Sequence, residues 1–191
     1  MRKRSGLSFS RRRNRNNHIM KEAGSWAVHI FIAIFFAVIF VYFFGMRVSV
    51  IGGSMENTLY NGQQILVNRL SYLILGPKEG DIIVFRPTGS KNTHAYIKRV
   101  VAVPGDTVWV KDGRLFVNHE IMEYGYDKIM DAGIAENEIT LGIEEYFVMG
   151  DNCNSSEDSR SGNIGPVTKD MIEGKAWFCM GNHLSLFGFI K

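Results

Sequence analysis

Three separated segments of this 191-residue chain carry side chains that could act together chemically. In the first segment, Ser54 follows two glycines, Gly52 and Gly53. Glycines let another backbone approach closely, which a nucleophile and its bound substrate require. A Gly-Gly-Ser sequence is also common in plain flexible turns, so this segment alone does not identify a nucleophile. A serine hydroxyl needs a neighbouring base, which has to come from another segment.

The second segment, residues 96–106, contains a lysine inside an otherwise apolar strand. Strict alternation puts Lys98 on the same face as Val100 and Ala102. Arg99 falls on the opposite face, so one of the two basic residues must point toward a packed face. Burial lowers the pKa of an amine because the charged form loses its hydration, and a neutral lysine can act as a general base. The alternative is a lysine at a sheet edge whose ammonium reaches solvent.

The third segment, residues 146–162, is a strand followed by a dense polar loop. A calcium-binding loop would need oxygen ligands at alternate positions from Asp151 and a bidentate glutamate at the twelfth position. Cys153 and Gly162 stand in two of those positions, so the sequence does not predict a calcium site.

The polar residues of this loop suit other roles. Asp158 and Arg160 have the charges and spacing to form a structural ion pair. The loop also carries three hydroxyls that could orient a neighbouring lysine, those of Ser155, Ser156 and Ser159.

The rest of the chain after residue 47 predicts a mainly β fold, because its apolar residues form short β-branched runs separated by turn residues. The runs expected to be strands are 64–68, 81–85, 96–103, 107–110, 115–117, 145–149 and 176–180. Asp112 and Gly113 supply the positive φ angles of a tight hairpin turn between two of these runs. Residues 120–142 are acidic and weakly periodic, and we interpret them as an inserted, variable segment. The chain has no nucleotide-binding or zinc-protease motif.

The N-terminus predicts a membrane anchor. Residues 1–21 hold eight of the 22 basic side chains and no acidic one, which leaves 14 basic against 19 acidic residues, or −5, for the rest. A nucleic-acid-binding fold would need its basic residues on the folded body, so we do not expect a nucleic-acid partner. Residues 26–44 have no formally charged side chain and match the length of a membrane-spanning helix.

The apolar run is longer than the core of a secretory signal and lacks a small-x-small cleavage site at its end, which favours an uncleaved anchor. The positive-inside rule then predicts a cytoplasmic tail over residues 1–21, a transmembrane anchor over 22–47 and an extracytoplasmic domain over 48–191. On that side of the membrane Cys153 and Cys179 could form a disulfide or remain two buried thiols.

Together the three segments resemble the motifs of bacterial type I signal peptidases, the membrane-anchored Ser/Lys leader peptidases. The family pattern Ser-Met-x-Pro-Thr-Leu resembles residues 54–59, and Lys-Arg-Val followed by Pro-Gly-Asp resembles residues 98–106. The pattern Gly-Asp-Asn-x-x-x-Ser-x-Asp-Ser-Arg is matched in full by residues 150–160. Residues 80–85 are also similar to the family, and the motifs occur in the family's order behind an anchor.

The resemblance implies a coiled antiparallel β-sheet catalytic domain and an enzyme that needs no metal or organic cofactor. Ser54 would be the nucleophile and Lys98 the general base. Ser156 would orient the lysine, while Asp158 and Arg160 would support the loop. The expected partners are preproteins that carry a signal peptide, cut after small residues, and the lipid bilayer. The substrate and oxyanion loop would include Gly52, Gly53 and Met55, with the backbone N–H of Ser54 as oxyanion donor.

The sequence departs from the family pattern at three places. Asn57 replaces a proline, Cys153 replaces an arginine, and the glycines after Arg160, Gly162 and Gly165, do not fit the family spacing. Gly52 also stands where some members have a hydroxyl residue that assists the oxyanion. Two other kinds of function remain open at this point. One is a Ser/His hydrolase that would use His94, and the other is a membrane-anchored β binding or assembly module that has lost its activity.

Overall fold

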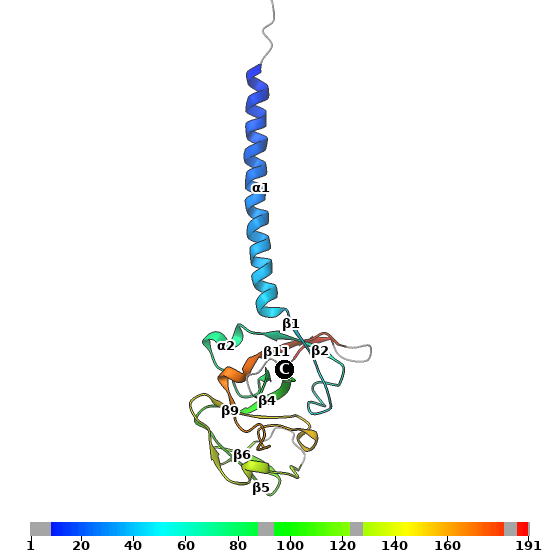
Figure 1. Cartoon of the computed structure of the whole chain (residues 1–191), viewed down its shortest axis with the longest axis vertical. Coiled ribbons are helices and arrows are strands. Elements are labelled where there is room, and N and C mark those ends of the chain that lie inside the picture. Colours follow the sequence, from blue (N-terminus) through cyan, green and yellow to red (C-terminus); the bar gives the residue numbers. More distant parts are fainter. Residues whose placement is uncertain (1–8, 88–93, 123–127, 182–186, 191) are drawn as a thin grey trace, which may run out of the picture. The chain divides into compact units, whose positions relative to one another are not determined.

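The computed structural model describes residues 9–87, 94–122, 128–181 and 187–190 of the chain. The chain divides into two compact units, Met1–Tyr42 and Phe43–Lys191 (Figure 1). The predicted cytoplasmic tail lies partly outside the described residues, since the first eight residues are not among them.

The N-terminal unit consists of one long helix, α1 (Phe9–Phe44). Its apolar part, Ile19–Phe44, is 26 residues long and contains an 18-residue stretch with a mean hydropathy of 2.7. At 1.5 Å per residue this part is about 39 Å long, more than the roughly 30 Å of a bilayer's hydrocarbon core. By length and composition the helix can cross a membrane, as the sequence predicts.

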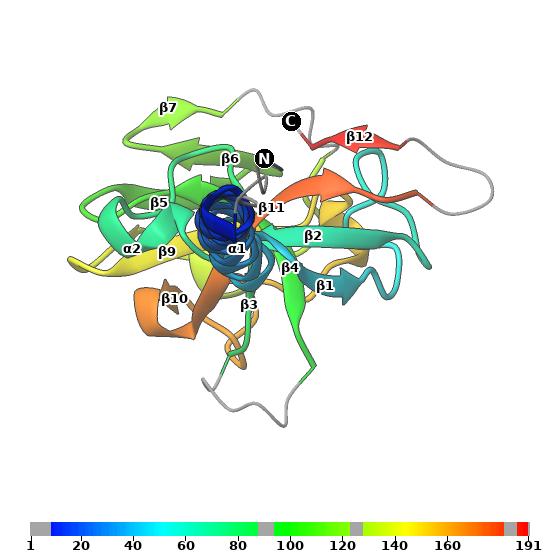
Figure 2. The same ribbon diagram turned by 90° about the horizontal axis from the view of Figure 1, so that it is seen from above.

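The second unit is mainly β, as predicted, and its larger sheet has eight strands (Figures 1 and 2). Their order is β1-β2-β11-β3-β4-β9-β10, with β12 paired to β11, and neighbouring strands are antiparallel. The strands are β1 (Met46–Ser49), β2 (Gln64–Asn68), β3 (Ile82–Phe85), β4 (Tyr96–Ala102), β9 (Glu145–Met149), β10 (Val167–Thr168), β11 (Ile172–Cys179) and β12 (Gly188–Phe189).

The smaller sheet has the order β7-β6-β5-β8, with all pairs antiparallel. Its strands are β5 (Thr107–Lys111), β6 (Arg114–Val117), β7 (Glu120–Ile121) and β8 (Ile139–Thr140). Asp112 and Gly113 join β5 to β6 with φ angles of 53° and 76°, so the predicted hairpin is confirmed. The short helices are α2 (Ser71–Ile74), η1 (Gly133–Glu136), η2 (Cys153–Ser155) and η3 (Lys169–Met171).

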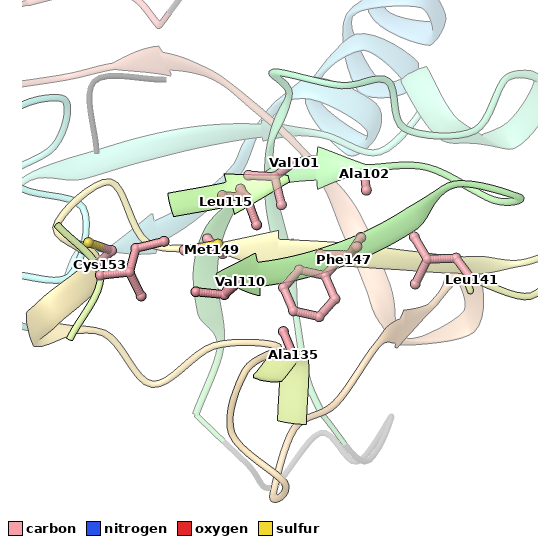
Figure 3. Close-up of a cluster of buried hydrophobic side chains, with 11 residues drawn as sticks. Val101, Ala102, Val110, Leu115, Ala135, Leu141, Phe147, Met149 and Cys153 are labelled. Carbon is pink, nitrogen blue, oxygen red and sulfur yellow. The ribbon is translucent and has the colours of Figure 1, made fainter. Parts of the chain in front are cut away.

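One hydrophobic cluster joins the two sheets (Figure 3). It combines side chains of β4 and β9 with side chains of β5 and β6, among them Val101, Phe147, Val110 and Leu115. Ile129, Ala135 and Leu141 belong to the same cluster. The segment interpreted as an insertion therefore contributes to the core, although its residues 123–127 lie outside the described part.

The alternation predicted for β4 holds only in part. The pairing of β4 with β9 shifts register between Val100 and Ala102, and Val101 and Ala102 lie in one cluster while Val100 lies in another. Ala102 therefore does not share a face with Val100, because the bulge interrupts the two-residue period. The sequence also predicted that one of the two basic residues would point toward a packed face. In the structure both Lys98 and Arg99 are buried.

The two cysteines do not form a disulfide. Cys153 and Cys179 are both buried, and they belong to different hydrophobic clusters. Of the two states that the sequence left open, the structure shows the pair of thiols.

Candidate active site

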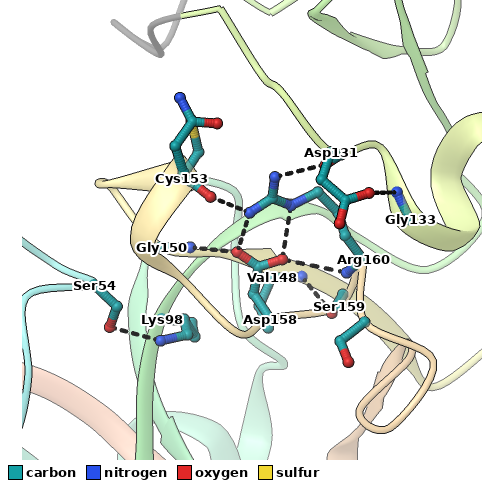
Figure 4. A network of polar contacts seen from close by, with 12 residues as sticks. Ser54, Lys98, Asp131, Gly133, Val148, Gly150, Cys153, Asp158, Ser159 and Arg160 are labelled. Atoms are coloured by element: carbon teal, nitrogen blue, oxygen red, sulfur yellow. Dashed lines mark hydrogen bonds and ion pairs between the residues drawn. The ribbon is translucent and has the colours of Figure 1, made fainter.

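The structure brings Ser54 and Lys98 into direct contact (Figure 4). The distance from Lys98 Nζ to Ser54 Oγ is 2.7 Å, which is a hydrogen bond across 44 residues of sequence. Ser54 lies in the loop between β1 and β2, after Gly52, whose φ of 83° favours glycine. Lys98 lies on β4, in register with Ile83 of β3, and its side chain reaches the loop from the sheet.

The environment of Lys98 favours its neutral form. The residue is only 3% exposed. Burial lowers the pKa of its amine from 10.5 to about 8, and the carboxylates of Asp158 and Glu157 oppose that effect. Burial prevails because an ammonium loses its hydration, and the nearby carboxylates restore only part of that loss. A large fraction of Lys98 is therefore unprotonated at mildly alkaline pH.

Apolar anchors and a backbone hydrogen bond hold the Ser54 loop in place. Met55 and Leu59 are each 1% exposed in the cluster that packs on β2, β3 and β11. The backbone N–H of Asn152 donates to the carbonyl of Ser54 at 3.0 Å. Ile51 is 78% exposed, so the apolar residues around Ser54 divide between core and surface.

A buried ion pair fastens the polar loop after β9. Arg160 Nε lies 2.9 Å from Oδ1 of Asp158, and Nη2 lies 2.9 Å from Oδ2. Arg160 also donates to the carbonyls of Asp131 and Cys153, while Gly150 N–H donates to Asp158 (Figure 4). The pair that the sequence predicted is present, and its hydrogen bonds hold both ends of the loop together.

A second ion pair, which the sequence analysis missed, connects the Ser54 loop to the loop after β9. Arg99 binds Asp151 through Nε at 2.8 Å and through Nη2 at 2.7 Å, and donates to the carbonyl of Gly80 at 2.8 Å. Thr58, in the Ser54 loop, donates to the same carboxylate. The signal was present in the sequence, because an arginine follows Lys98 and an aspartate follows Gly150 in the two motifs already identified.

A cleft of about 380 Å³ opens beside Ser54 and Lys98. One wall is the loop from Val50 to Met55, and the other is formed by Ala95 and the first three residues of β4, Tyr96 to Lys98. His94, Ser155 and Glu157 also line it.

Comparison with known proteins assigns the chain to a family. Residues 23–181 match the sequence profile of the family described as signal peptidase, peptidase S26. The chain belongs to this signal peptidase family.

Two curated relatives illustrate the similarity. The chain is 36% identical over 162 residues to signal peptidase I P of Bacillus subtilis subsp. natto, which covers 80% of this chain and 86% of the relative. It is 32% identical over 169 residues to signal peptidase I T of Bacillus subtilis strain 168, and this match covers 80% of this chain and 82% of the relative. A crystal structure of a signal peptidase I from Enterococcus faecalis V583 matches 52% of this chain and 95% of that chain, with 28% identity and a TM-score of 0.40.

The serines of the polar loop occupy different environments in this signal peptidase. Ser159 Oγ accepts a hydrogen bond from the backbone N–H of Val148 at 3.0 Å, so this hydroxyl stabilises the backbone. Ser156 Oγ is buried and has no hydrogen-bond partner in the described part of the chain. It lies beside Gly150, where an added Cβ would be 2.3 Å from Ser156 Oγ and 2.4 Å from the carbonyl oxygen of Ser54. A hydrogen bond between Ser156 and Lys98, through which the serine would orient the lysine, is therefore not formed in this structure.

Asn57, which stands where the signal peptidase pattern has proline, has a φ of 84°. A proline ring fixes φ near −65°, so this turn has a conformation that proline cannot adopt. Asparagine is one of the few residues with a side chain that tolerate this region. The departure from the pattern therefore changes the backbone of the loop and not only its rigidity.

His94 lines the cleft, but the group bonded to the hydroxyl of Ser54 is the amine of Lys98. Among the described residues, no three His, Cys, Asp or Glu side chains are grouped so that they could hold a metal ion.

Proposed function

We propose that this signal peptidase removes signal peptides from exported preproteins with Ser54 as nucleophile and neutral Lys98 as general base. The observation that carries the proposal is the 2.7 Å contact between Ser54 Oγ and the buried amine of Lys98. The assignment favours a Ser/Lys mechanism over a Ser/His mechanism, because the amine and not His94 is the hydroxyl's partner.

In the first step Lys98 accepts the proton of Ser54 Oγ while the oxygen attacks the carbonyl carbon of the scissile bond. The resulting ammonium then donates this proton to the leaving amine, and an acyl-enzyme remains on Ser54. A water molecule, deprotonated by the same lysine, hydrolyses that ester and restores the serine. Each proton that Lys98 takes up it also returns, so the cycle needs no further base.

The tetrahedral intermediate needs a hydrogen-bond donor for its oxyanion. The backbone N–H of Ser54 has no acceptor among the described residues, which supports its assignment as that donor. The backbone N–H of Gly52 donates to Asn61 Oδ1 at 3.1 Å, so it is engaged within the loop. Gly52, Gly53 and Met55 therefore act by shaping the loop. Substrates with small side chains before the scissile bond are expected, as in the family.

We further propose that residues 1–21 are cytoplasmic, 22–47 form the anchor and 48–191 are extracytoplasmic, with the bilayer as a partner. The basic tail and the apolar span of α1 support this orientation. Ser54 follows Phe44 by ten residues, so the chain keeps it within roughly 35 Å of the end of the helix. The exposed rings of Phe187 and Phe189 offer the second unit an apolar surface for the membrane interface.

A cleavage assay on a purified preprotein tests the assignment. Ser54→Ala and Lys98→Ala should each abolish cleavage while the circular dichroism spectrum stays unchanged. Lys98→Arg keeps the positive charge but cannot deprotonate, so it should also be inactive. Cleavage by any of the three variants at a rate near that of the unaltered protein would refute the dyad, and an unaltered protein that cleaves no preprotein would favour a binding module.

A further inference from the structure

Glu157 is a charged residue on the wall of the cleft that the proposed reaction does not use. It is exposed, belongs to the polar loop after β9, and lines the cleft together with Tyr96. The hydroxyl of Tyr96 donates to Oε2 of Glu157 at 3.2 Å. This bond holds the carboxylate beside β4, and the other oxygen keeps its capacity to accept hydrogen bonds.

The charge of Glu157 is not compensated in the way that the charges of the other carboxylates near the dyad are. Asp151 and Asp158 each form an ion pair with a buried arginine, so their charges are compensated. Within the described ranges no lysine, arginine or histidine forms an ion pair with Glu157. Burial lowers the pKa of Lys98, and Glu157 is one of the carboxylates that oppose this effect, so its charge acts inside the cleft.

Glu157 also borders a second cavity next to the cleft. It lines a second cavity of about 540 Å³, which continues along the polar loop past Ser156 toward Asp131 and Ile134. A peptide chain that extends from the cleft beside Ser54 into this second cavity therefore runs past the carboxylate of Glu157.

We propose that Glu157 is a specificity-determining residue that favours substrates with a cationic side chain close to the scissile bond. The inference rests on the proteolytic function proposed above and adds a substrate preference to it. Single exposed ion pairs are weak, so the preference is roughly two- to fivefold in kcat/KM. It decreases with added salt, because exposed charges are screened over about 10 Å at 0.1 M ionic strength.

The test uses the full-length protein in detergent and a set of peptides that differ at one position. Each peptide carries Arg, Gln or Glu at one site in the residues flanking the scissile bond, and every site is sampled in turn. Arginine is used because it stays charged at any pH of the assay. The measured quantity is the ratio of kcat/KM between the Arg and Gln peptides and between the Glu and Gln peptides.

For the unaltered protein, the Arg peptide should be cleaved two to five times faster than the Gln peptide at one or more positions, and the Glu peptide more slowly. Glu157→Gln should bring both ratios to about one at those positions, and Glu157→Lys should reverse them. Glu120→Gln removes an exposed carboxylate of β7 in the other sheet and should leave the ratios unchanged. Ratios taken within one variant cancel any common effect of the substitution on Lys98.

Ratios near one at every position in the unaltered protein, or ratios that Glu157→Lys leaves unchanged, would overturn the inference while the proteolytic function stands. If the unaltered protein cleaves none of the peptides any faster than Ser54→Ala does, the proposed function itself fails and the preference fails with it.

Discussion

Replacing Lys98 with methionine is expected to stabilise the protein at neutral pH while it abolishes cleavage. Burial lowers the pKa of this lysine from 10.5 to about 8 in the folded protein. Below pH 8 the amine is protonated in both folded and unfolded chains, and the folded protein carries the full cost of the buried charge. Between pH 8 and 10.5 only the unfolded chain keeps the proton, so the free energy of unfolding rises with pH in that interval. Above 10.5 the cost has disappeared.

The size of the effect follows from the difference between the two pKa values. Each pKa unit corresponds to about 1.4 kcal/mol, so the buried ammonium costs about 3 kcal/mol at pH 7. Methionine has a similar length and no charge, but it loses the hydrogen bond to Ser54, which contributes about 1 kcal/mol. Lys98→Met should therefore gain about 2 kcal/mol at pH 7. For a domain of this size that gain raises Tm by roughly 4–8 °C.

The assay compares Tm for the unaltered protein and Lys98→Met at pH 7, 9 and 10.5, since effects of all other groups cancel in the difference. The advantage of the methionine variant should decrease from pH 7 to 10.5 and vanish or reverse at the upper end. Lys78→Met changes an exposed lysine and should show no such pH dependence. In parallel, kcat/KM of the unaltered protein should rise about tenfold per pH unit below pH 8 and level off above it. A Tm difference that is constant with pH would refute the buried, neutral lysine.

Three further predictions concern the loops and the anchor. Asn57→Pro, which restores the family residue, should lower Tm because proline cannot adopt a φ of 84°. Asn57→Gly should leave Tm equal or higher, and an unchanged Tm for the proline variant would contradict this loop conformation. Arg160→Ala leaves the carboxylate of Asp158 buried without its partner and should cost about 3–5 kcal/mol in chemical denaturation, and a cost below 1 kcal/mol would show that the pair is dispensable. A chain that starts at Arg47 should cleave membrane-embedded precursors much more slowly than the full chain does, with a smaller loss of rate on a short soluble peptide. Equal losses of rate on both substrates would mean that the anchor serves folding.

The sequence predicted the larger strands because they combine β-branched residues with clear turn residues at their ends, although it placed the start of β11 at residue 176 and not at Ile172. It missed the short strands β1, β7, β8, β10 and β12, which have two to four residues and no periodic pattern of their own. Such strands form because a neighbouring strand offers hydrogen-bond partners, and this is a tertiary effect. The bulge in β4 has the same origin, since it depends on how β4 pairs with β9.

The candidate site was predictable to the extent that residue type restricts chemistry. A lysine in an apolar strand and a serine after two glycines are unusual enough to be singled out. The ion pair of Arg99 and Asp151 was not predicted. Both residues lie in motifs that the sequence identifies, but the motifs do not say that these two side chains meet. The absence of a hydrogen bond from Ser156 to Lys98 also depends on the placement of side chains, which sequence patterns do not determine.

Burying the amine of Lys98 costs stability, so the elements that carry Lys98 and Ser54 have to be anchored firmly by the rest of the domain. The buried amine would gain about 3 kcal/mol by moving into water at pH 7, so the sheet has to hold it in place. β4 lies between β3, which pairs with it at Lys98 and Arg99, and β9, which pairs with it from Arg99 onward. On the other side, Met55 and Leu59 fix the Ser54 loop in the core. The 2.7 Å contact is therefore set by two independently anchored elements, and it does not depend on a hydrogen bond from Ser156.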